Sequence, residues 1–145
     1  MEVLFHQRSP LPDPGLPARR VPLEQALAAD FVVVAVPGGL ATHHLINAEA
    51  LRHMMPGGIF INISRGDVVD EAALVAALKA GQISGAGLDV YELEPQVHPG
   101  LLDLENVTLL PHLGTSALEV REAMGLMALD NLIAFTEGRP LPNPV

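Results

Sequence analysis

Four residues of this sequence carry side chains suited to binding an anion and moving a proton. Each stands at or just after the end of a short apolar segment, and together they are Arg65, Asp89, Glu94 and His112. A guanidinium binds a carboxylate through paired hydrogen bonds, and an imidazole beside a carboxylate is a proton donor near neutral pH. Any one of them alone would be an ordinary solvated or structural residue. Their order along the chain favours a catalytic site over chance placement.

Short apolar segments bounded by Pro, Gly or Asn predict the strands that position these residues. The five expected strands cover residues 2–6, 31–36, 59–64, 85–90 and 107–110. The second and third are apolar almost without alternation, which is typical of strands covered by helices on both faces. Helical patterns alternate with them at residues 23–29, 47–55, 70–80 and 116–137. This order predicts a doubly wound, Rossmann-like α/β fold with a parallel sheet.

Capping residues mark the expected helix ends. Asn47 is an expected N-cap, and Gly81 an expected C-terminal cap. Ser116 with Glu119 has the spacing of a capping box at the start of the last helix. That helix is apolar on several faces, so it is expected to have partners on more than one side.

An open parallel sheet binds ligands beyond the carboxyl ends of its strands. The segments expected at that edge are residues 7–10, 37–42, 64–67, 89–94 and 111–116. The residues 11–17 between the first strand and the first helix are expected to form a surface loop.

Composition excludes several classes of protein. The chain has 145 residues, 49% hydrophobic and 17% charged, with a mean hydropathy of +0.33, as expected for one globular domain. Its net charge of −9 makes nucleic acid and anionic membranes poor partners. The absence of Cys excludes disulfides, thiol catalysis and Cys-ligated zinc.

No membrane span is expected, because the uncharged stretch 31–48 is interrupted by Pro37, Gly38 and Gly39. The first residues lack a signal-peptide pattern, which favours a cytoplasmic protein.

Most histidines have no spacing that indicates a metal site. His6, His43, His44, His53 and His98 form no HExxH motif. They are expected to be surface or loop residues with no metal role.

Three longer segments carry a family resemblance. They are Asn62-Ile-Ser-Arg-Gly-Asp-Val-Val-Asp-Glu71, Gly87-Leu-Asp-Val-Tyr-Glu-Leu-Glu-Pro95 and Pro111-His-Leu-Gly114. In order and spacing they resemble the signature segments of the D-isomer-specific 2-hydroxyacid dehydrogenases, a family that includes glyoxylate and hydroxypyruvate reductases. The resemblance covers nearly the whole chain, from the Arg8 loop to residues 138–140.

The resemblance implies an NAD(P)-dependent oxidoreductase that reduces a small 2-keto acid by hydride transfer. It implies that Arg65 binds the substrate carboxylate and polarises the keto oxygen, and that His112 is the acid/base with Glu94 as its partner. Asp89 would accept a hydrogen bond from the nicotinamide carboxamide. The cofactor-binding residues it implies are Arg8, Ser9, Pro37, Ile63, Ser64, Arg65, Asp89, His112 and Gly114.

The residues after the first expected strand indicate the cofactor type. An NAD site places an acidic residue there to hold the ribose hydroxyls, whereas this chain has no carboxylate between His6 and Asp13. Arg8 could instead bind a 2′-phosphate, and the resemblance implies the same through the Arg8-Ser9 pair. The expected cofactor is therefore NADP, with NAD possible.

The sequence lacks the glycine-rich turn that seats a dinucleotide pyrophosphate. No GxGxxG or GxxxxGK occurs, and Gly85-Ala86-Gly87 has Val90 where the third glycine belongs. The resemblance implies a C-terminal fragment of the nucleotide-binding domain, without its first strand and nearly all of the substrate domain. In the strand order 3-2-1-4-5-6, residues 3–6 and 59–64 would then face a gap. The helix at 116–137 would pack on the missing substrate domain, and the isolated chain is expected to have little or no activity.

Two functional hypotheses follow. The first is the reductase, and the alternative is a noncatalytic remnant or scaffold module of the same fold. Residues 37–42 depart from the family's Pro-Leu-Thr-Pro-x-Thr, and two glycines there are expected to make the loop mobile. The residues do not separate glyoxylate, hydroxypyruvate and phenylpyruvate as substrates. The last helix and the family's usual dimer favour a homodimer.

Overall fold

The structure is a computed structural model, and it describes residues 1–9 and 15–144. The chain divides into two compact units, Met1–Pro111 and His112–Val145. The expected surface loop at 11–17 lies largely outside the described residues. Its last three positions, 15–17, are exposed bends.

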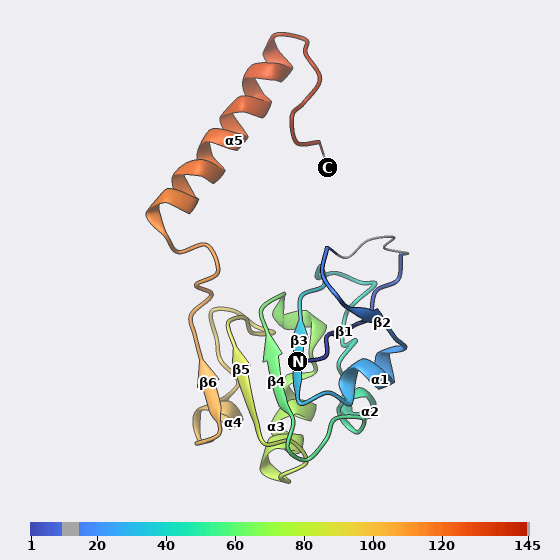
Figure 1. The fold of residues 1–145 in the computed structure, drawn as a ribbon. Helices are drawn as coiled ribbons and strands as arrows, with labels where there is room; N and C mark the ends of the chain where they lie inside the picture. The colour runs from blue at the N-terminus through green and yellow to red at the C-terminus, as the bar shows by residue number, and fades with distance from the viewer. Residues whose placement is uncertain (10–14, 145) are drawn as a thin grey trace. The chain divides into compact units, whose positions relative to one another are not determined.

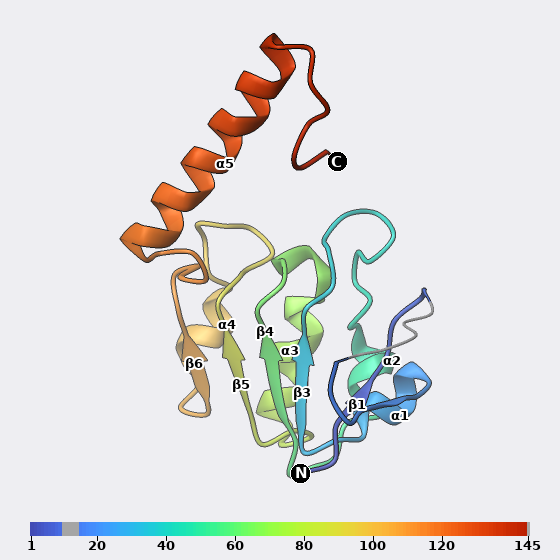
Figure 2. The same cartoon turned by 45° about the horizontal axis from the view of Figure 1, so that its top comes forward.

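A four-stranded parallel sheet forms the centre of the first unit (Figure 1). Its strands are β3 (Phe31–Val34), β4 (Ile59–Asn62), β5 (Gly85–Leu88) and β6 (Val107–Leu109), in the spatial order β3-β4-β5-β6. All four run in the same direction, as their arrows show in Figure 2. Asn62 is in register with Val34 on one side and Leu88 on the other, and Leu88 is in register with Leu109. The strands therefore end level with one another, and the segments that follow them leave from one edge.

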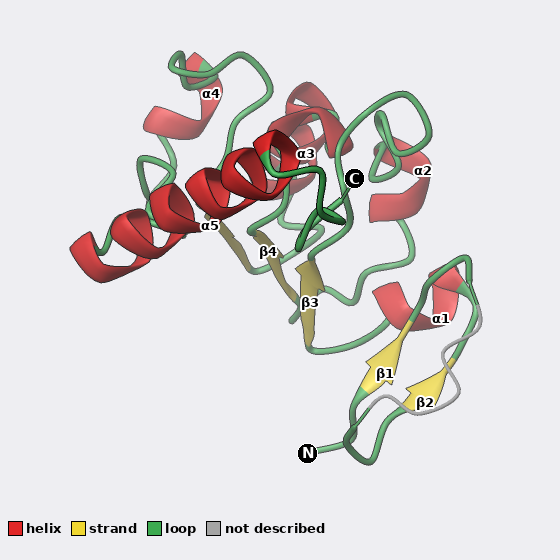
Figure 3. Cartoon of the chain, turned by 90° about the horizontal axis from the view of Figure 1, so that it is seen from above, coloured by secondary structure: helices red, strands yellow, loops and turns green. Residues whose placement is uncertain are grey.

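Three helices pack together on one face of this sheet (Figure 3). They are α2 (Ala48–Leu51), α3 (Glu71–Lys79) and α4 (Pro99–Leu102). Fully buried Phe60 of β4 joins Leu51, Leu74 and Leu101 from these helices in one apolar core. Burial of large aliphatic and aromatic side chains of this kind is the main stabilising contribution to the fold.

A second, smaller sheet and a short helix complete the first unit. The strands β1 (Leu4–Phe5) and β2 (Arg19–Arg20) pair in parallel, and α1 (Leu23–Leu27) follows them. The strand at Arg19–Arg20 was not expected, because two consecutive arginines lack an apolar β pattern. Backbone hydrogen bonds hold it: Arg19 N donates to Val3 O and Val21 N to Phe5 O.

The expected caps of the two central helices are confirmed. Asn47 accepts hydrogen bonds from the amides of Glu49 and Ala50. Asp70, expected only as the first residue of its helix, is also an N-cap and accepts from the Ala73 amide at 2.9 Å. Gly81 follows α3 with φ +66°, the left-handed conformation that glycine adopts without strain. The caps place the starts of both helices and the end of α3 close to the predicted residues, but α2 ends at Leu51 and not at residue 55.

The expected burial of residues 31–36 and 59–64 on both faces is wrong for part of each segment. Val32 and Val34 are buried, but Phe31 is 60% exposed, Val33 54% and Ile63 57%. An uninterrupted apolar run shows that both faces suit burial, but it does not show that both are covered. One face of the edge of the sheet is open here.

The expected position of the gap is also wrong. Residues 59–64 do not face a gap, because β4 pairs with β3 on one side and β5 on the other. Within the described residues it is β3 that pairs on one side only, while β1 pairs with β2. The error arose because the strand at Arg19–Arg20 was missed, so each later strand was counted one position too early.

The second unit contains one long helix, α5 (Leu118–Thr136). The Ser116 capping box is wrong, because the N-cap is Ala117, without a side-chain cap. Ser116 Oγ instead accepts from the Arg121 guanidinium at 3.4 Å. The helix ends as expected, with Glu137 as C-cap and Gly138 at φ +67°. No described helix combines the length and apolarity needed to cross a membrane.

Candidate active site

An open cleft of about 900 Å³ lies at the carboxyl edge of the central sheet. Segments that follow β3, β4 and β5 line it. The lining residues are Gly38, Gly39, Arg65, Gly66, Asp67, Tyr91, Glu92, Leu93, Glu94 and Gln96. Arg65 and Glu94, two of the three residues expected to be catalytic, thus line the same cleft.

Asn62 organises the turn that carries Arg65. This last residue of β4 is only 1% exposed, and its Oδ1 accepts hydrogen bonds from both the amide and the hydroxyl of Ser64, each at 3.0 Å. Its Nδ2 donates to the Arg65 carbonyl at 3.1 Å. A buried amide with its bonds satisfied fixes the local backbone, because any other arrangement leaves polar groups unpaired. Asn62 therefore sets the direction in which Arg65 leaves the sheet.

Gly66 allows the Arg65 turn to lie directly against the segment after β5. A Cβ at residue 66 would lie 1.8 Å from the carbonyl carbon of Tyr91. Only glycine permits so close an approach of two backbones. The segments that carry Arg65 and Glu94 are thus in direct contact.

The segment after β5 is held at Tyr91. Its amide donates to Glu94 Oε1 at 3.1 Å, and its phenol donates to the Leu110 carbonyl at 2.7 Å. Burial, reinforced by the charge of Asp89, raises the pKa of Tyr91, so the phenol stays a hydrogen-bond donor. The Tyr91 side chain thereby connects the segment after β5 to the residue that follows β6, shortly before His112 in the sequence.

The loop after β3 lies against Arg65. Gly39 N donates to Asp67 Oδ2 at 3.0 Å, and the Thr42 hydroxyl donates to Pro37 O at 2.6 Å. A Cβ at Gly38 would lie 2.8 Å from Arg65 Cγ. Glycine at position 38 therefore lets this loop support the Arg65 side chain.

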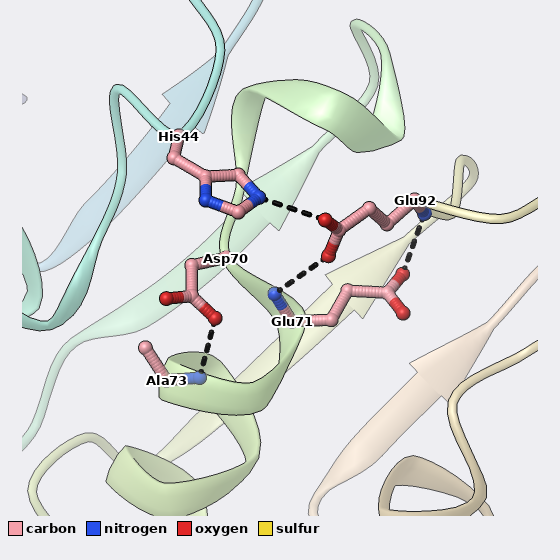
Figure 4. A network of polar contacts seen from close by, with 5 residues as sticks. All are labelled: His44, Asp70, Glu71, Ala73 and Glu92. Carbon is pink, nitrogen blue, oxygen red and sulfur yellow. Dashed lines mark hydrogen bonds and ion pairs between the residues drawn. The ribbon is translucent and has the colours of Figure 1, made fainter.

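A polar network that sequence reasoning missed lies behind the cleft (Figure 4). Glu71 Oε1 accepts from the amide of Glu92 at 2.9 Å, and Glu92 Oε2 accepts from the amide of Glu71 at 3.4 Å. Glu92 Oε1 also lies 2.7 Å from His44 Nε2. Glu71 is 5% exposed, and burial raises its pKa above the usual 4.5, although the hydrogen bond from Glu92 opposes the shift. No local pattern in the sequence identifies this network, since its members are far apart along the chain.

The remaining residues expected at the cofactor site lie on several segments. Asp89 is half-buried directly after β5, where its amide donates to Asn62 O at 3.1 Å. Ser64 is buried, whereas Pro37 and Ile63 are exposed. His112 and Gly114 belong to the second unit, where His112 adopts a positive φ of 54°.

Arg8 and Ser9 are exposed after β1. The guanidinium of Arg20, on the paired strand β2, donates to the carbonyls of Gln7 at 2.7 Å and Arg8 at 3.0 Å. The Arg20 guanidinium therefore lies beside the backbone of Gln7 and Arg8, and the described residues 6–9 contain no carboxylate. Guanidinium donors on this segment and on β2 suit a nucleotide phosphate, and the bonds from Arg20 were not apparent from the sequence.

The histidines fall into groups that differ in their contacts. His98 Nδ1 accepts from Gly100 N at 3.0 Å as the N-cap of α4, and His6 Nδ1 lies 3.1 Å from Val21 O. His43 stacks on His44, and their ring nitrogens lie within 4.8 Å of a Glu92 oxygen and of each other. This donor set suits a divalent transition metal. The 2.7 Å separation of His44 and Glu92 is that of a direct hydrogen bond, so we assign both to the polar network.

The cleft combines one cation with several carboxylates. Arg65 is the only positively charged residue among those that line it, beside Asp67, Glu92 and Glu94. Arg65 Nη1 donates to the Ser64 carbonyl at 2.7 Å, which leaves further guanidinium donors for an anion. The arrangement can bind one small carboxylate and holds carboxylates that can orient a proton donor.

Comparison with known proteins gives a consistent result. Residues 1–114 match a family model described as the NAD-binding domain of D-isomer-specific 2-hydroxyacid dehydrogenases. The whole chain is 45% identical to a glyoxylate reductase of Thermococcus onnurineus, of which it covers 44%. It is 43% identical over 143 residues to a hydroxyphenylpyruvate reductase of Plectranthus scutellarioides, of which it covers 46%.

Solved structures of related enzymes show the same similarity. An NADPH-dependent glyoxylate/hydroxypyruvate reductase of Sinorhizobium meliloti, in complex with NADP and malonate, has a TM-score of 0.92 at 42% identity, over 99% of this chain and 45% of that one. The holo form of a Rhodotorula graminis D-mandelate dehydrogenase has a TM-score of 0.94 at 38% identity, over 100% of this chain and 44% of that one. The chain thus spans less than half the length of the curated relatives it matches.

Proposed function

Since the chain belongs to the D-isomer-specific 2-hydroxyacid dehydrogenase family, we propose that it supplies the cofactor-side catalytic residues of an NAD(P)-dependent reductase of small 2-keto acids. One observation carries the proposal: Arg65 and Glu94 follow different strands and line one cleft at the carboxyl edge of the sheet. This edge is where open α/β sheets bind ligands.

Each residue has a distinct role in the proposed reaction. The Arg65 guanidinium binds the substrate carboxylate and polarises the keto oxygen. His112 donates a proton to that oxygen, and Glu94 favours the charged imidazole and orients it. When bound, the nicotinamide cofactor supplies the hydride for the keto carbon. Asp89 orients the nicotinamide carboxamide, and Pro37, Ile63, Ser64 and Gly114 complete the cofactor contacts.

The proposed cofactor is NADPH, with NADH as the weaker alternative. Arg8 and Ser9 would contact the 2′-phosphate, and Arg20 holds the backbone of that segment. The guanidinium groups of Arg8 and Arg20, with no carboxylate among the described residues 6–9, favour a phosphate over free ribose hydroxyls. The NADP complex of the Sinorhizobium meliloti reductase supports this choice.

The domain organisation is also proposed. Residues 1–145 would form part of a nucleotide-binding domain, with α5 packing on further protein, either a substrate domain or the second chain of a homodimer. The exposed apolar side chains of α5, including Leu126, Leu132 and Phe135, support such a role. We also propose that the protein is cytoplasmic and acts on glyoxylate or hydroxypyruvate.

The test uses a chimera, because residues 1–145 alone are proposed to turn over slowly or not at all. The chain replaces the matching 148-residue alignment region of the Thermococcus onnurineus glyoxylate reductase, and NADPH oxidation is followed with glyoxylate and hydroxypyruvate. An active chimera that loses roughly 10²-fold or more in kcat with His112→Asn or Glu94→Gln supports the proposal. Arg65→Gln should raise KM most strongly, and exposed Arg52→Gln is the matched control.

The alternative function is a noncatalytic module of the same fold. An inactive, folded chimera beside an active parent enzyme would favour it. Rapid turnover by residues 1–145 alone would instead refute the proposal that this stretch needs further protein for activity.

A further inference from the structure

Glu71 lies outside the cleft, yet its carboxylate is bonded to the segment that carries Glu94. It is the first residue of α3, and its Oε1 accepts from Glu92 N at 2.9 Å. The Glu92 carboxylate in turn accepts from Glu71 N at 3.4 Å, and its other oxygen lies 2.7 Å from His44 Nε2. Three segments that are distant in sequence therefore meet at Glu92, as Figure 4 shows.

The contact lies next to the amide that binds the Glu94 carboxylate. Glu94 Oε1 accepts from Tyr91 N, and the next amide along the chain, that of Glu92, donates to Glu71. The backbone between these two amides lies directly against Gly66, which blocks movement toward the Arg65 turn. Release of the Glu92 amide would remove one of the contacts that hold the backbone to which the Glu94 carboxylate is bonded.

Burial indicates that the Glu71 carboxyl serves as a hydrogen-bond acceptor and not as a charged group. Its side chain is 5% exposed, and an ionised carboxylate in such a place is costly to keep. A protonated carboxyl or a primary amide keeps a carbonyl oxygen that accepts from the Glu92 amide equally well. Position 71 therefore requires an sp² acceptor oxygen as far from the backbone as the one that a Glu or Gln side chain carries.

We propose that Glu71 is a positioning residue that holds residues 91–94, and with them the Glu94 carboxylate, at the cleft. The proposal deepens the reductase function given above, because it names the group that places the partner of the proton donor. Glu71 itself touches neither substrate nor cofactor.

The test compares three substitutions that separate reach from charge. Glu71→Gln keeps the length and the acceptor, Glu71→Asp keeps the ionisable carboxyl but shortens the reach, and Glu71→Ala removes both. Glu49→Ala is the matched control, since Glu49 is also acidic and in the first turn of a helix but is exposed. Each variant of the full chain is examined by amide NMR, and circular dichroism verifies the fold.

Two amides give the readout. Hydrogen exchange at Glu92 should quicken roughly tenfold in Glu71→Asp and Glu71→Ala, as expected for loss of one hydrogen bond. Hydrogen exchange at the Tyr91 amide, which is bonded to Glu94 Oε1, should also quicken in these two variants. Glu71→Gln and Glu49→Ala should behave as wild type.

The opposite ranking, with Asp like wild type and Gln like Ala, would mean that charge and not reach matters, and it would overturn the proposal. Unchanged exchange at the Tyr91 amide in Glu71→Asp and Glu71→Ala would do the same. If Glu71→Ala does not fold, the Gln and Asp variants still decide. None of these signals needs turnover or bound cofactor, so failure here is distinct from failure of the proposed reductase function.

Discussion

Gly66 and the backbone of Tyr91 are so close that no side chain fits between them. A Cβ at residue 66 would lie 1.8 Å from the Tyr91 carbonyl carbon, 1.9 Å from its oxygen and 2.3 Å from Glu92 N. All three are backbone atoms, so no side-chain rotation relieves the clash. Two strands separated by α3 thereby present Arg65 and Glu94 to one cleft.

Gly66→Ala should therefore destabilise the first unit by about 1–3 kcal/mol or more, because an added methyl forces apart two packed backbones. Urea unfolding, followed by the fluorescence of the single tyrosine, Tyr91, measures the change. Gly57→Ala is the control, since a Cβ there meets nothing within 4 Å. Equal stability of the two variants would contradict the close approach.

Asn62→Ala should cost about 2 kcal/mol or more, because it leaves the buried amide and hydroxyl of Ser64 without their acceptor. Asn106→Ala is matched chemically, since Asn106 also donates to a carbonyl, but it is exposed and should cost less than about 1 kcal/mol. Urea unfolding of both variants tests the difference. A smaller loss for Asn62 than for Asn106 would mean that the turn does not depend on this amide.

Tyr91→Phe removes only the hydroxyl that donates to Leu110 O at 2.7 Å. The expected loss of unfolding free energy is about 0.5–1.5 kcal/mol, the usual contribution of one hydrogen bond. Far-UV circular dichroism is the suitable probe, since the variant has no tyrosine. A gain in stability would show that the phenol is not held by this carbonyl.

The sequence predicted most of the sheet, two helix caps and the residues at the strand ends because these depend on local patterns. Apolar runs identify β3 to β6, the Asn47 cap bonds to amides two and three residues away, and Gly81 follows α3 at a positive φ. The position of the gap depended on the strand Arg19–Arg20, which pairs through backbone hydrogen bonds and which no apolar pattern marks. Ser116 shows the reverse case, since a correct capping spacing did not produce a cap.

The residues that hold the candidate site in place were harder to predict than the site residues themselves. Arg65 and Glu94 stand in recognisable segments, but Glu71 and His44 reach Glu92 across 21 and 48 residues of sequence. A buried glutamate at the start of a helix looks like an ordinary first-turn acid. Only the fold shows that its partner is a backbone amide beside the cleft.

Arg20→Ala should weaken the preference for NADPH over NADH, because Arg20 holds the carbonyls of Gln7 and Arg8 and adds positive charge there. The expected change is roughly tenfold in the ratio of the two dissociation constants, since a hydrogen bond from a charged group contributes about 1.5 kcal/mol. Titration calorimetry with both cofactors on the chimera measures it, with Arg52→Ala as control. An unchanged ratio would exclude Arg20 from the choice of cofactor.

The stability of Glu71→Gln relative to wild type should depend on pH. Burial raises the pKa of Glu71 in the folded chain above its usual 4.5, so its protonated form is favoured by folding. The resulting contribution to stability is fully present below pH 4.5 and is lost as pH rises through the raised pKa. Glutamine does not titrate and keeps the acceptor for Glu92 N. The variant should therefore gain on wild type as pH rises from about 4 to 7, measured by urea unfolding at each pH. A Glu71→Gln difference that is flat or falls with pH would mean that burial does not disfavour ionisation of this carboxyl.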